Sequence, residues 1–334
     1  MGSPGVGEVA RVGGTARLLS RSLSGYLCGT HSGWLDRRRG DRFSLEGLSA
    51  SERAPGAAVP AKRLTWDARW QPENQAASLA ERLGAVLDHP AIVEVLIYGS
   101  HAGGTPTGFS DLDAVVVIED RAANAGATLR ELRPRVLAAQ RALLAYQPMQ
   151  HHGFEVATPE LLANADATLE LPREALQGAR SMFGRRIDAG FSGGSIDPAG
   201  RLRSVVAQLS CLRAWPRHPW KVHGAVSMFE LLPALYVQAI GVAASKAESF
   251  AVAREQLEGA WWPYDVLEQV REAWPRKRNR RLELAASAAR NPWVAVAAWT
   301  RLPSQLPAAI GPLLSASCLK SLQELARLMT ERTR

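Results

Sequence analysis

Two aspartates separated by a single residue, Asp111 and Asp113, stand out as groups that could do chemistry. They lead into a short apolar run, residues 114–118, which is typical of a buried strand. Because residues i and i+2 of a strand point to the same face, the two carboxylates would project side by side. Carboxylates held that close resist ionising together, and a hard divalent cation such as Mg²⁺ relieves their repulsion. The pair therefore predicts a metal site.

A Gly-Ser pair, Gly99 and Ser100, ends the preceding apolar run of residues 93–98. Such a turn exposes backbone N–H groups and a hydroxyl, which are the parts of an anion-binding nest. Because Mg²⁺ often bridges protein carboxylates and substrate phosphates, a carboxylate pair beside a nest predicts a nucleoside triphosphate site. The plain alternative is a hairpin with a polar loop and two solvated aspartates, but the intervening loop is longer than a tight hairpin needs.

The order strand, Gly-Ser, loop, Asp-x-Asp, strand resembles the signature of the DNA polymerase β-like nucleotidyltransferase superfamily over residues 79–158. The resemblance implies transfer of a nucleoside monophosphate from a nucleoside triphosphate, such as ATP, to a hydroxyl group. It also implies that Asp111 and Asp113 hold two Mg²⁺ ions, and that Gly99 and Ser100 bind the triphosphate. Members of the superfamily often carry a helical domain after the catalytic one.

The same resemblance implies a third carboxylate on a later strand, which helps to hold the metal or acts as the catalytic base. The matching residue is Glu155, in a segment that reads as the third strand. The alternation of apolar and polar residues in this segment does not decide which face of the sheet Glu155 takes. His151 would share the face of Glu155, and His152 would lie on the other face. A histidine could replace the acid as base, because its pKa suits proton transfer near neutrality. Glu155 as a plain surface residue is the third alternative.

The organisation of the chain predicts an α+β fold, in which a small mixed sheet of the nucleotidyltransferase type with flanking helices precedes an all-α C-terminal domain. We expect residues 1–62 to be a mostly disordered leader, which a downstream start of translation would explain simply. The catalytic domain would cover residues 63–160, a connector residues 161–200, and the helical domain residues 201–334.

Two basic features of the predicted helical domain are candidates for binding. Lys246 lies between two apolar helices and could reach a triphosphate as a point charge, although an ordinary turn with a solvated lysine explains it as well. The run Arg276–Arg281, with the sequence RKRNRR, suggests nucleic-acid binding, and a solvated helix start is the alternative.

The overall composition narrows the class of protein. The formal net charge of +8 and the pI of about 9.8 are compatible with a nucleotide or nucleic-acid partner. The three cysteines lie far apart without metal-ligand spacing, which argues against a disulfide framework or a zinc site and favours a reducing cytoplasm. No apolar stretch is typical of a secretory signal or a membrane span, so no membrane partner is expected.

The sequence thus predicts a cytoplasmic, Mg²⁺-dependent nucleotidyltransferase with a hydroxyl acceptor, for which a small molecule is the first choice. Transfer to a protein or a tRNA is the alternative within the enzyme class. From another class, a non-catalytic nucleotide sensor with the same fold stays open. Placement of Glu155 within metal reach of the aspartates would favour the enzyme, whereas an outward-facing Glu155 with no acidic or histidine substitute would favour the sensor.

Overall fold

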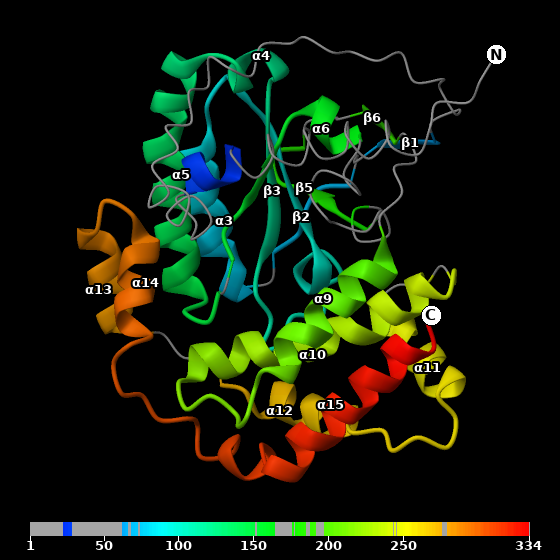
Figure 1. Ribbon diagram of the computed structural model, residues 1–334. Coiled ribbons are helices and arrows are strands. Elements are labelled where there is room, and N and C mark those ends of the chain that lie inside the picture. The colour runs from blue at the N-terminus through cyan, green and yellow to red at the C-terminus, as the bar shows by residue number, and fades with distance from the viewer. Residues whose placement is uncertain are drawn as a thin grey trace, which may run out of the picture.

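Figure 1 shows the computed structural model of the chain, coloured from the N-terminus to the C-terminus. The residues it describes are 23–28, 62–65, 68–72, 74–150, 152–163, 176, 178–184, 188–191, 197–242, 244, 246–275 and 279–333. None of the helices in these ranges combines the length and the apolar character needed to cross a membrane.

A four-stranded mixed sheet forms the centre of the molecule, in the order β4-β3-β2-β5. Strand β2 (Ile92–Tyr98) pairs antiparallel with β3 (Asp113–Ile118), so that Tyr98 lies opposite Asp113. The edge strand β4 (Glu155–Ala157) runs parallel to β3, and β5 (Arg180–Ser181) runs antiparallel to β2. The predicted mixed sheet with flanking helices is confirmed at this level.

Helices cover this sheet because their apolar sides match its buried residues. Helices α3 (Asn74–Leu87) and α5 (Gly126–Tyr146) pack on each other beside the sheet. The short helices α4 (Asp120–Ala123) and α6 (Pro159–Ala163) follow β3 and β4 at its upper end in Figure 1. A separate two-stranded ladder joins β1 (Lys62–Thr65) to β6 (Asp188–Phe191).

A helical segment of the leader, residues 23–28, is part of the same core. The side chains of Leu23, Leu27 and Cys28 are at most 1% exposed. The hydroxyl of Ser24 accepts a hydrogen bond from the Val156 N–H at 2.8 Å, and the Cys28 thiol donates to the Phe154 carbonyl oxygen at 3.1 Å. This segment is therefore an ordered part of a leader that is expected to be mostly disordered, because its leucines repeat at helical spacing and fill the core. The rest of the predicted leader up to residue 61 lies outside the described residues.

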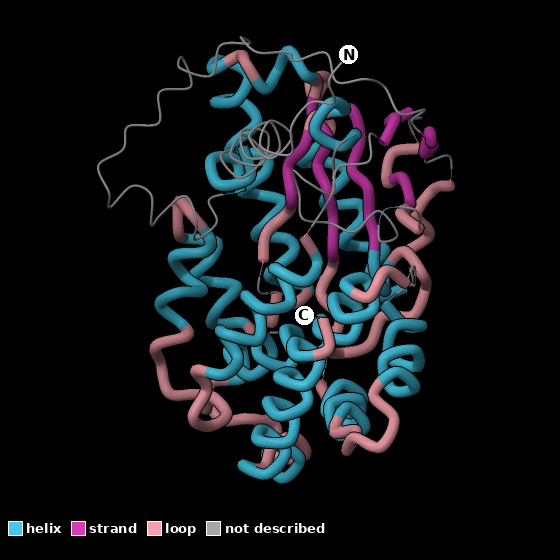
Figure 2. The backbone as a smooth tube through the Cα atoms, turned by 45° about the vertical axis from the view of Figure 1, so that its right-hand side comes forward, coloured by secondary structure: helices cyan, strands magenta, loops and turns pink. Residues whose placement is uncertain are grey.

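Every described element from residue 198 onward is a helix, and Figure 2 shows these helices below the strands. A second core joins α9 (Pro198–Ser210), α10 (Pro219–Ala239), α11 (Lys246–Gln256), α12 (Tyr264–Ala273), the short turn η3 (Gly311–Leu313) and α15 (Ala316–Glu331).

A helical hairpin, α13 (Arg280–Ala288) and α14 (Pro292–Trp299), packs on α5 of the sheet layer instead of joining the second core. The Arg141 guanidinium of α5 donates hydrogen bonds to the carbonyl oxygens of Ala286, Ala289 and Arg290 at 2.8–3.1 Å. These bonds satisfy carbonyls at the end of α13 that a helix leaves without internal partners. The sequence assigned these two helices to the C-terminal helical domain, but in the structure they pack on the sheet layer.

The burial of residues 23–28 leads to a stability prediction. Replacement of Leu27 with Ala should lower the free energy of unfolding by about 2–5 kcal/mol, because it removes a fully buried side chain and leaves a cavity. Chemical denaturation of the full chain measures the change. The matched control is Leu302→Ala, since that side chain is 60% exposed. Equal effects of the two substitutions would contradict the packing of this segment.

Candidate active site

The turn after β2 brings the backbone of Gly99 against the carboxylate of Asp113. Gly99 begins a short 3₁₀ turn, η2 (Gly99–His101), with a φ of 69° that favours glycine. A Cβ atom at this position would lie 2.6 Å from Asp113 Oδ2. This contact explains why a residue without a side chain stands here: the pairing of Tyr98 with Asp113 leaves no room for one.

Two buried glutamine side chains form hydrogen bonds with the backbone of the Asp-x-Asp segment and of the loop before it. Gln150, which is fully buried, accepts from the Leu112 N–H at 3.1 Å and donates to the Leu112 carbonyl oxygen at 3.3 Å. Gln147 donates to the carbonyl oxygens of Gly108 and Ser110 at 3.1 and 2.8 Å. Leu112 itself is 1% exposed, as the alternation predicts. The glutamines thus fix the backbone from which both aspartates project.

Phe109, in the loop before the aspartates, is anchored in the helical layer. Its ring stacks on His223 of α10 with centroids 4.0 Å apart, and meets the edge of Trp274 at 5.3 Å. The His223 Nε2–H donates to the Phe109 carbonyl oxygen at 2.7 Å. Phe109 is 3% exposed and belongs to the second core. The loop is therefore held by both layers of the molecule.

His152 lies between the two aspartates. Its Nε2 is 3.0 Å from Asp113 Oδ1 and 3.6 Å from Asp111 Oδ2. Burial alone would lower the pKa of His152, but the hydrogen bond to Asp113 and the charges of Asp113 and Asp111 raise it to about 10. The imidazolium therefore neutralises part of the negative charge that the pair concentrates. Strand alternation did not place His152 because it precedes β4, where the strand geometry has not begun.

Glu155 opens β4 directly opposite Val115 in the parallel ladder. Residues opposite each other in a ladder share a face, so Glu155 lies on the face of Val115 and Asp113. Its Oε2 accepts a hydrogen bond from the Ser24 hydroxyl at 3.4 Å. Burial and then the charges of Asp113, Glu155 and Asp111 raise the pKa of Tyr98 well above its usual value, while Arg201 acts to lower it.

The predicted ligands do not come together as one set of three. Within the ranges that the structure describes, no group of three or more His, Cys, Asp or Glu side chains is arranged to hold a metal ion. Asp111 and Asp113 both lie close to His152 Nε2. Glu155 lies on the neighbouring strand β4, opposite Val115, which is two residues after Asp113. Its role as third ligand or base stays a prediction, and His151 lies outside the described residues.

The residues present nonetheless fit a hard divalent cation. Two carboxylates side by side supply the oxygen ligands that Mg²⁺ prefers. The glycine at position 99 leaves open the space beside Asp113 Oδ2 that a side chain would occupy. The position of His152 Nε2, 3.0 Å from Asp113 Oδ1 and 3.6 Å from Asp111 Oδ2, is one that attracts positive charge.

The three residues predicted to bind the triphosphate lie on different layers, with Gly99 and Ser100 in the η2 turn and Lys246 on α11. Ser100 is in the η2 turn, where its carbonyl oxygen accepts from the Thr105 N–H at 3.0 Å, and Trp70 braces the turn by donating to the His101 carbonyl oxygen. Lys246 begins α11, with Nζ 3.8 Å from Glu230 Oε2. No hydrogen bond joins these two described residues, Lys246 and Ser100, so a shared role stays a prediction.

Glu230 is a buried carboxylate that sequence reasoning missed. It is 2% exposed on α10, and Arg271 Nε lies 3.3 Å from its Oε1. Burial raises the pKa of Glu230, Lys246 and Arg271 act to lower it, and Asp111 adds to the rise. Its field therefore reaches the aspartate site from the helical layer. A lone acidic residue within the apolar stretch of α10 is the signal that could have identified it.

Comparison with known proteins gives no assignment. No protein-family model matches the chain, and no curated protein sequence matches it. The function is therefore inferred from the site itself.

The space at Gly99 leads to a metal-binding prediction. Gly99→Ala and Gly104→Ala both place a side chain at positive φ, at 69° and 71°, and each should cost about 1 kcal/mol of stability. Only the first puts a methyl group against Asp113, since nothing lies within 4 Å of a Cβ at Gly104. We expect Mg²⁺ to raise the melting temperature of the wild type and of Gly104→Ala, but not of Gly99→Ala. An equal response of both variants would contradict the proposed metal position.

The His152 environment leads to a pH prediction. Its pKa is raised from 6.5 to about 10 in the folded state, so the stabilisation is fully present below pH 6.5 and is lost as the pH rises towards 10. The His152→Gln variant should show less loss of stability across this window than the wild type. Denaturation midpoints across this pH range test it, and parallel profiles would show that the imidazole titrates normally.

Proposed function

We propose that the chain is a Mg²⁺-dependent nucleotidyltransferase, which transfers a nucleoside monophosphate from a nucleoside triphosphate to a hydroxyl group. The observation that supports this most is the pair Asp111 and Asp113, whose carboxylates both lie within 3.6 Å of His152 Nε2, with Asp113 placed against the Gly99 turn. Mg²⁺ held by the two aspartates would stabilise the charge that develops on the transferred phosphoryl group.

The residues around the pair have separate roles in this proposal. The η2 turn, with Ser100 and its backbone N–H groups, binds the triphosphate, and Lys246 adds positive charge from the helical layer. The acceptor oxygen forms a bond to the α-phosphorus, and the bond from that phosphorus to the bridging oxygen of pyrophosphate breaks. The acceptor proton passes to a base, for which Glu155 is the candidate, because the raised pKa of His152 keeps its imidazole protonated.

The acceptor is proposed to be a small hydroxylated molecule, with transfer to a protein or RNA hydroxyl as the alternative. The fold of a site does not determine its acceptor. Glu230, buried near Asp111 and paired with Lys246 and Arg271, lies on the layer that faces the aspartates and is available to shape this part of the site.

A second candidate function has an observation of its own. His152 bridges the aspartates as an imidazolium, and a protonated side chain there competes with a metal ion. A nucleotide-binding module that has lost turnover would retain such a bridge. Transfer activity separates this candidate from the enzyme.

The test is nucleotide transfer with Mg²⁺. Each α-³²P-labelled nucleoside triphosphate is incubated with the protein and a cell extract, beside the isosteric variant Asp111→Asn/Asp113→Asn. Label that appears on a small-molecule, RNA or protein fraction, and is absent with the variant, would establish the activity and the acceptor class. Tight nucleotide binding without transfer to any fraction would support the non-catalytic module.

A further inference from the structure

The positive charge of the helical region is concentrated in two stretches. Residues 198–229 contain five Lys or Arg residues and no acidic residue. Residues 276–301 contain seven Lys or Arg residues and a single acidic residue, Glu283. Such concentration differs from the mixed charges of an ordinary solvated surface and indicates a polyanionic partner.

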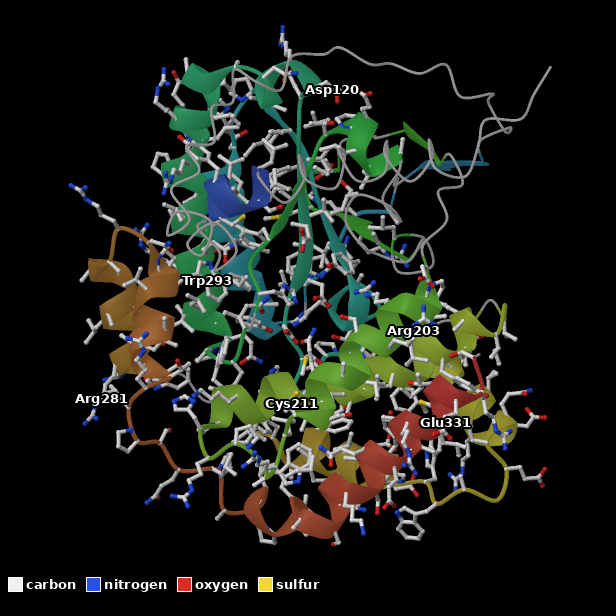
Figure 3. The ribbon with its side chains drawn as sticks, viewed as in Figure 1. Asp120, Arg203, Cys211, Arg281, Trp293 and Glu331 are labelled. Carbon is white, nitrogen blue, oxygen red and sulfur yellow. The ribbon has the colours of Figure 1, made fainter. Side chains whose placement is uncertain are left out.

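The two stretches meet in space. The rings of His218, at the start of α10, and Trp299, at the end of α14, are 4.7 Å apart and nearly perpendicular. Exposed basic residues lie within three positions of both rings in the chain, and further exposed basic residues lie at the two ends of α13. We call this set the basic belt: Arg217, Lys221, Arg280, Arg281, Arg290 and Arg301. Figure 3 shows Arg281 at the outer edge of the hairpin.

The charges of the belt are presented without neutralising partners. Among the described residues, none of the belt side chains forms an ion pair, whereas basic residues on α4, α11 and α15 do. The hairpin that carries most of the belt is fixed, because Arg141 bonds three of its carbonyl groups and Trp293 and Leu282 pack against Leu144. Guanidinium groups on a fixed hairpin that form no ion pair with any described residue are suited to binding phosphates in fixed positions.

We propose that the basic belt binds the phosphate backbone of single-stranded RNA. The belt crosses two separate helical elements, which suits an elongated chain, whereas membrane surfaces are typically bound by one amphipathic helix. Leu284 and Val294 are 73% and 53% exposed among the arginines and offer apolar contacts to bases. Unpaired strands with accessible bases are the usual targets of sequence-tolerant RNA binding.

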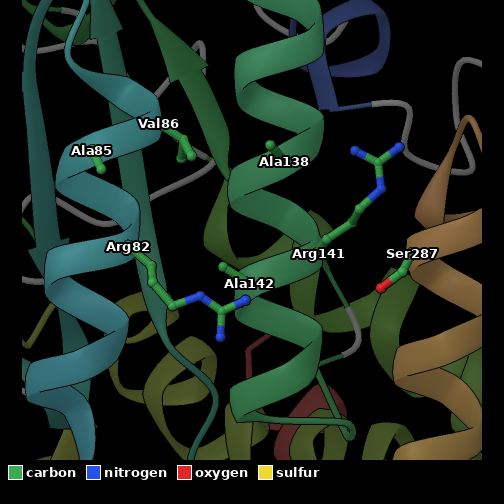
Figure 4. Close-up of a pocket in the computed structure, with 7 residues that line it drawn as sticks. All are labelled: Arg82, Ala85, Val86, Ala138, Arg141, Ala142 and Ser287. Carbon is green, nitrogen blue, oxygen red and sulfur yellow. The ribbon is translucent and has the colours of Figure 1, made fainter.

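A pocket beside the hairpin extends the surface towards α3. It has a volume of about 350 Å³ between α3, α5 and α13, and Arg82, Arg141 and Ser287 supply its polar groups. Figure 4 shows Arg82 extending from α3 towards Ala142 of α5, and Arg141 on the side of α5 that faces Ser287 of α13. The pocket is large enough to admit a base or a ribose-phosphate unit from a strand on the belt. This binding goes beyond the proposed transfer reaction and does not rest on it.

The experiment measures binding of a fluorescent single-stranded RNA of about 20 nucleotides to the full chain by anisotropy, without nucleotide, between about 50 and 300 mM KCl. The test variant is Arg280→Gln/Arg281→Gln/Arg290→Gln/Arg301→Gln. The control, Arg121→Gln/Arg254→Gln/Lys320→Gln/Arg327→Gln, removes the same charge from ion-paired surface sites. We expect the test variant to bind about tenfold or more weakly, with a log–log salt slope reduced by about 3, and the control to resemble the wild type.

Three results would overturn the proposal. The first is no RNA binding by the wild type at the lowest salt, and the second is an equal loss in both variants. The third is belt-dependent binding that is tighter for phosphatidylserine vesicles, or for DNA of the same sequence, than it is for RNA. The Asp111→Asn/Asp113→Asn variant keeps the outcome separate from the transfer proposal, because it should retain RNA binding even if transfer is never observed.

Discussion

The close approach of the Gly99 backbone to the Asp113 carboxylate is the constraint on which the site depends. Pairing of β2 with β3 sets Tyr98 opposite Asp113, and the chain must then turn away at once without a side chain. Two negative charges are thereby held at the end of a buried sheet, where burial makes them costly unless a cation neutralises them. His152 supplies that positive charge in the structure. The same concentration of negative charge makes the position suitable for a metal ion.

The helical layer acts as the support for this arrangement. Phe109 carries the loop into the second core, and Trp220 of α10 donates to the carbonyl oxygen of Gln150, the residue that brackets Leu112. Displacement of α10 would therefore disturb the aspartates through two separate connections. We interpret the sheet and the helices as one functional unit, because the positions of the catalytic candidates depend on contacts from both.

The local features of the site could be predicted from the sequence because they depend on neighbours in the chain. Both strands around the loop were expected within one residue of their observed bounds. The side-by-side placement of Asp111 and Asp113 was argued from strand alternation, whereas β3 begins only at Asp113, so that Asp111 lies in the loop before it. The glutamine clamps, the bridge by His152 and the contact of Ser24 with Glu155 could not be predicted. Each joins residues more than 30 positions apart, so only the packing of whole elements determines it.

Residues 23–28 cover the outer edge of the sheet at strand β4. β4 is an edge strand, and the Phe154 carbonyl and the Val156 N–H on its outer side would otherwise be open to pairing with another chain. The Ser24 hydroxyl and the Cys28 thiol occupy those two groups, and the leucines of the segment cover the apolar surface beside them. The segment thus takes the place of a fifth strand and closes the sheet against edge-to-edge association between molecules.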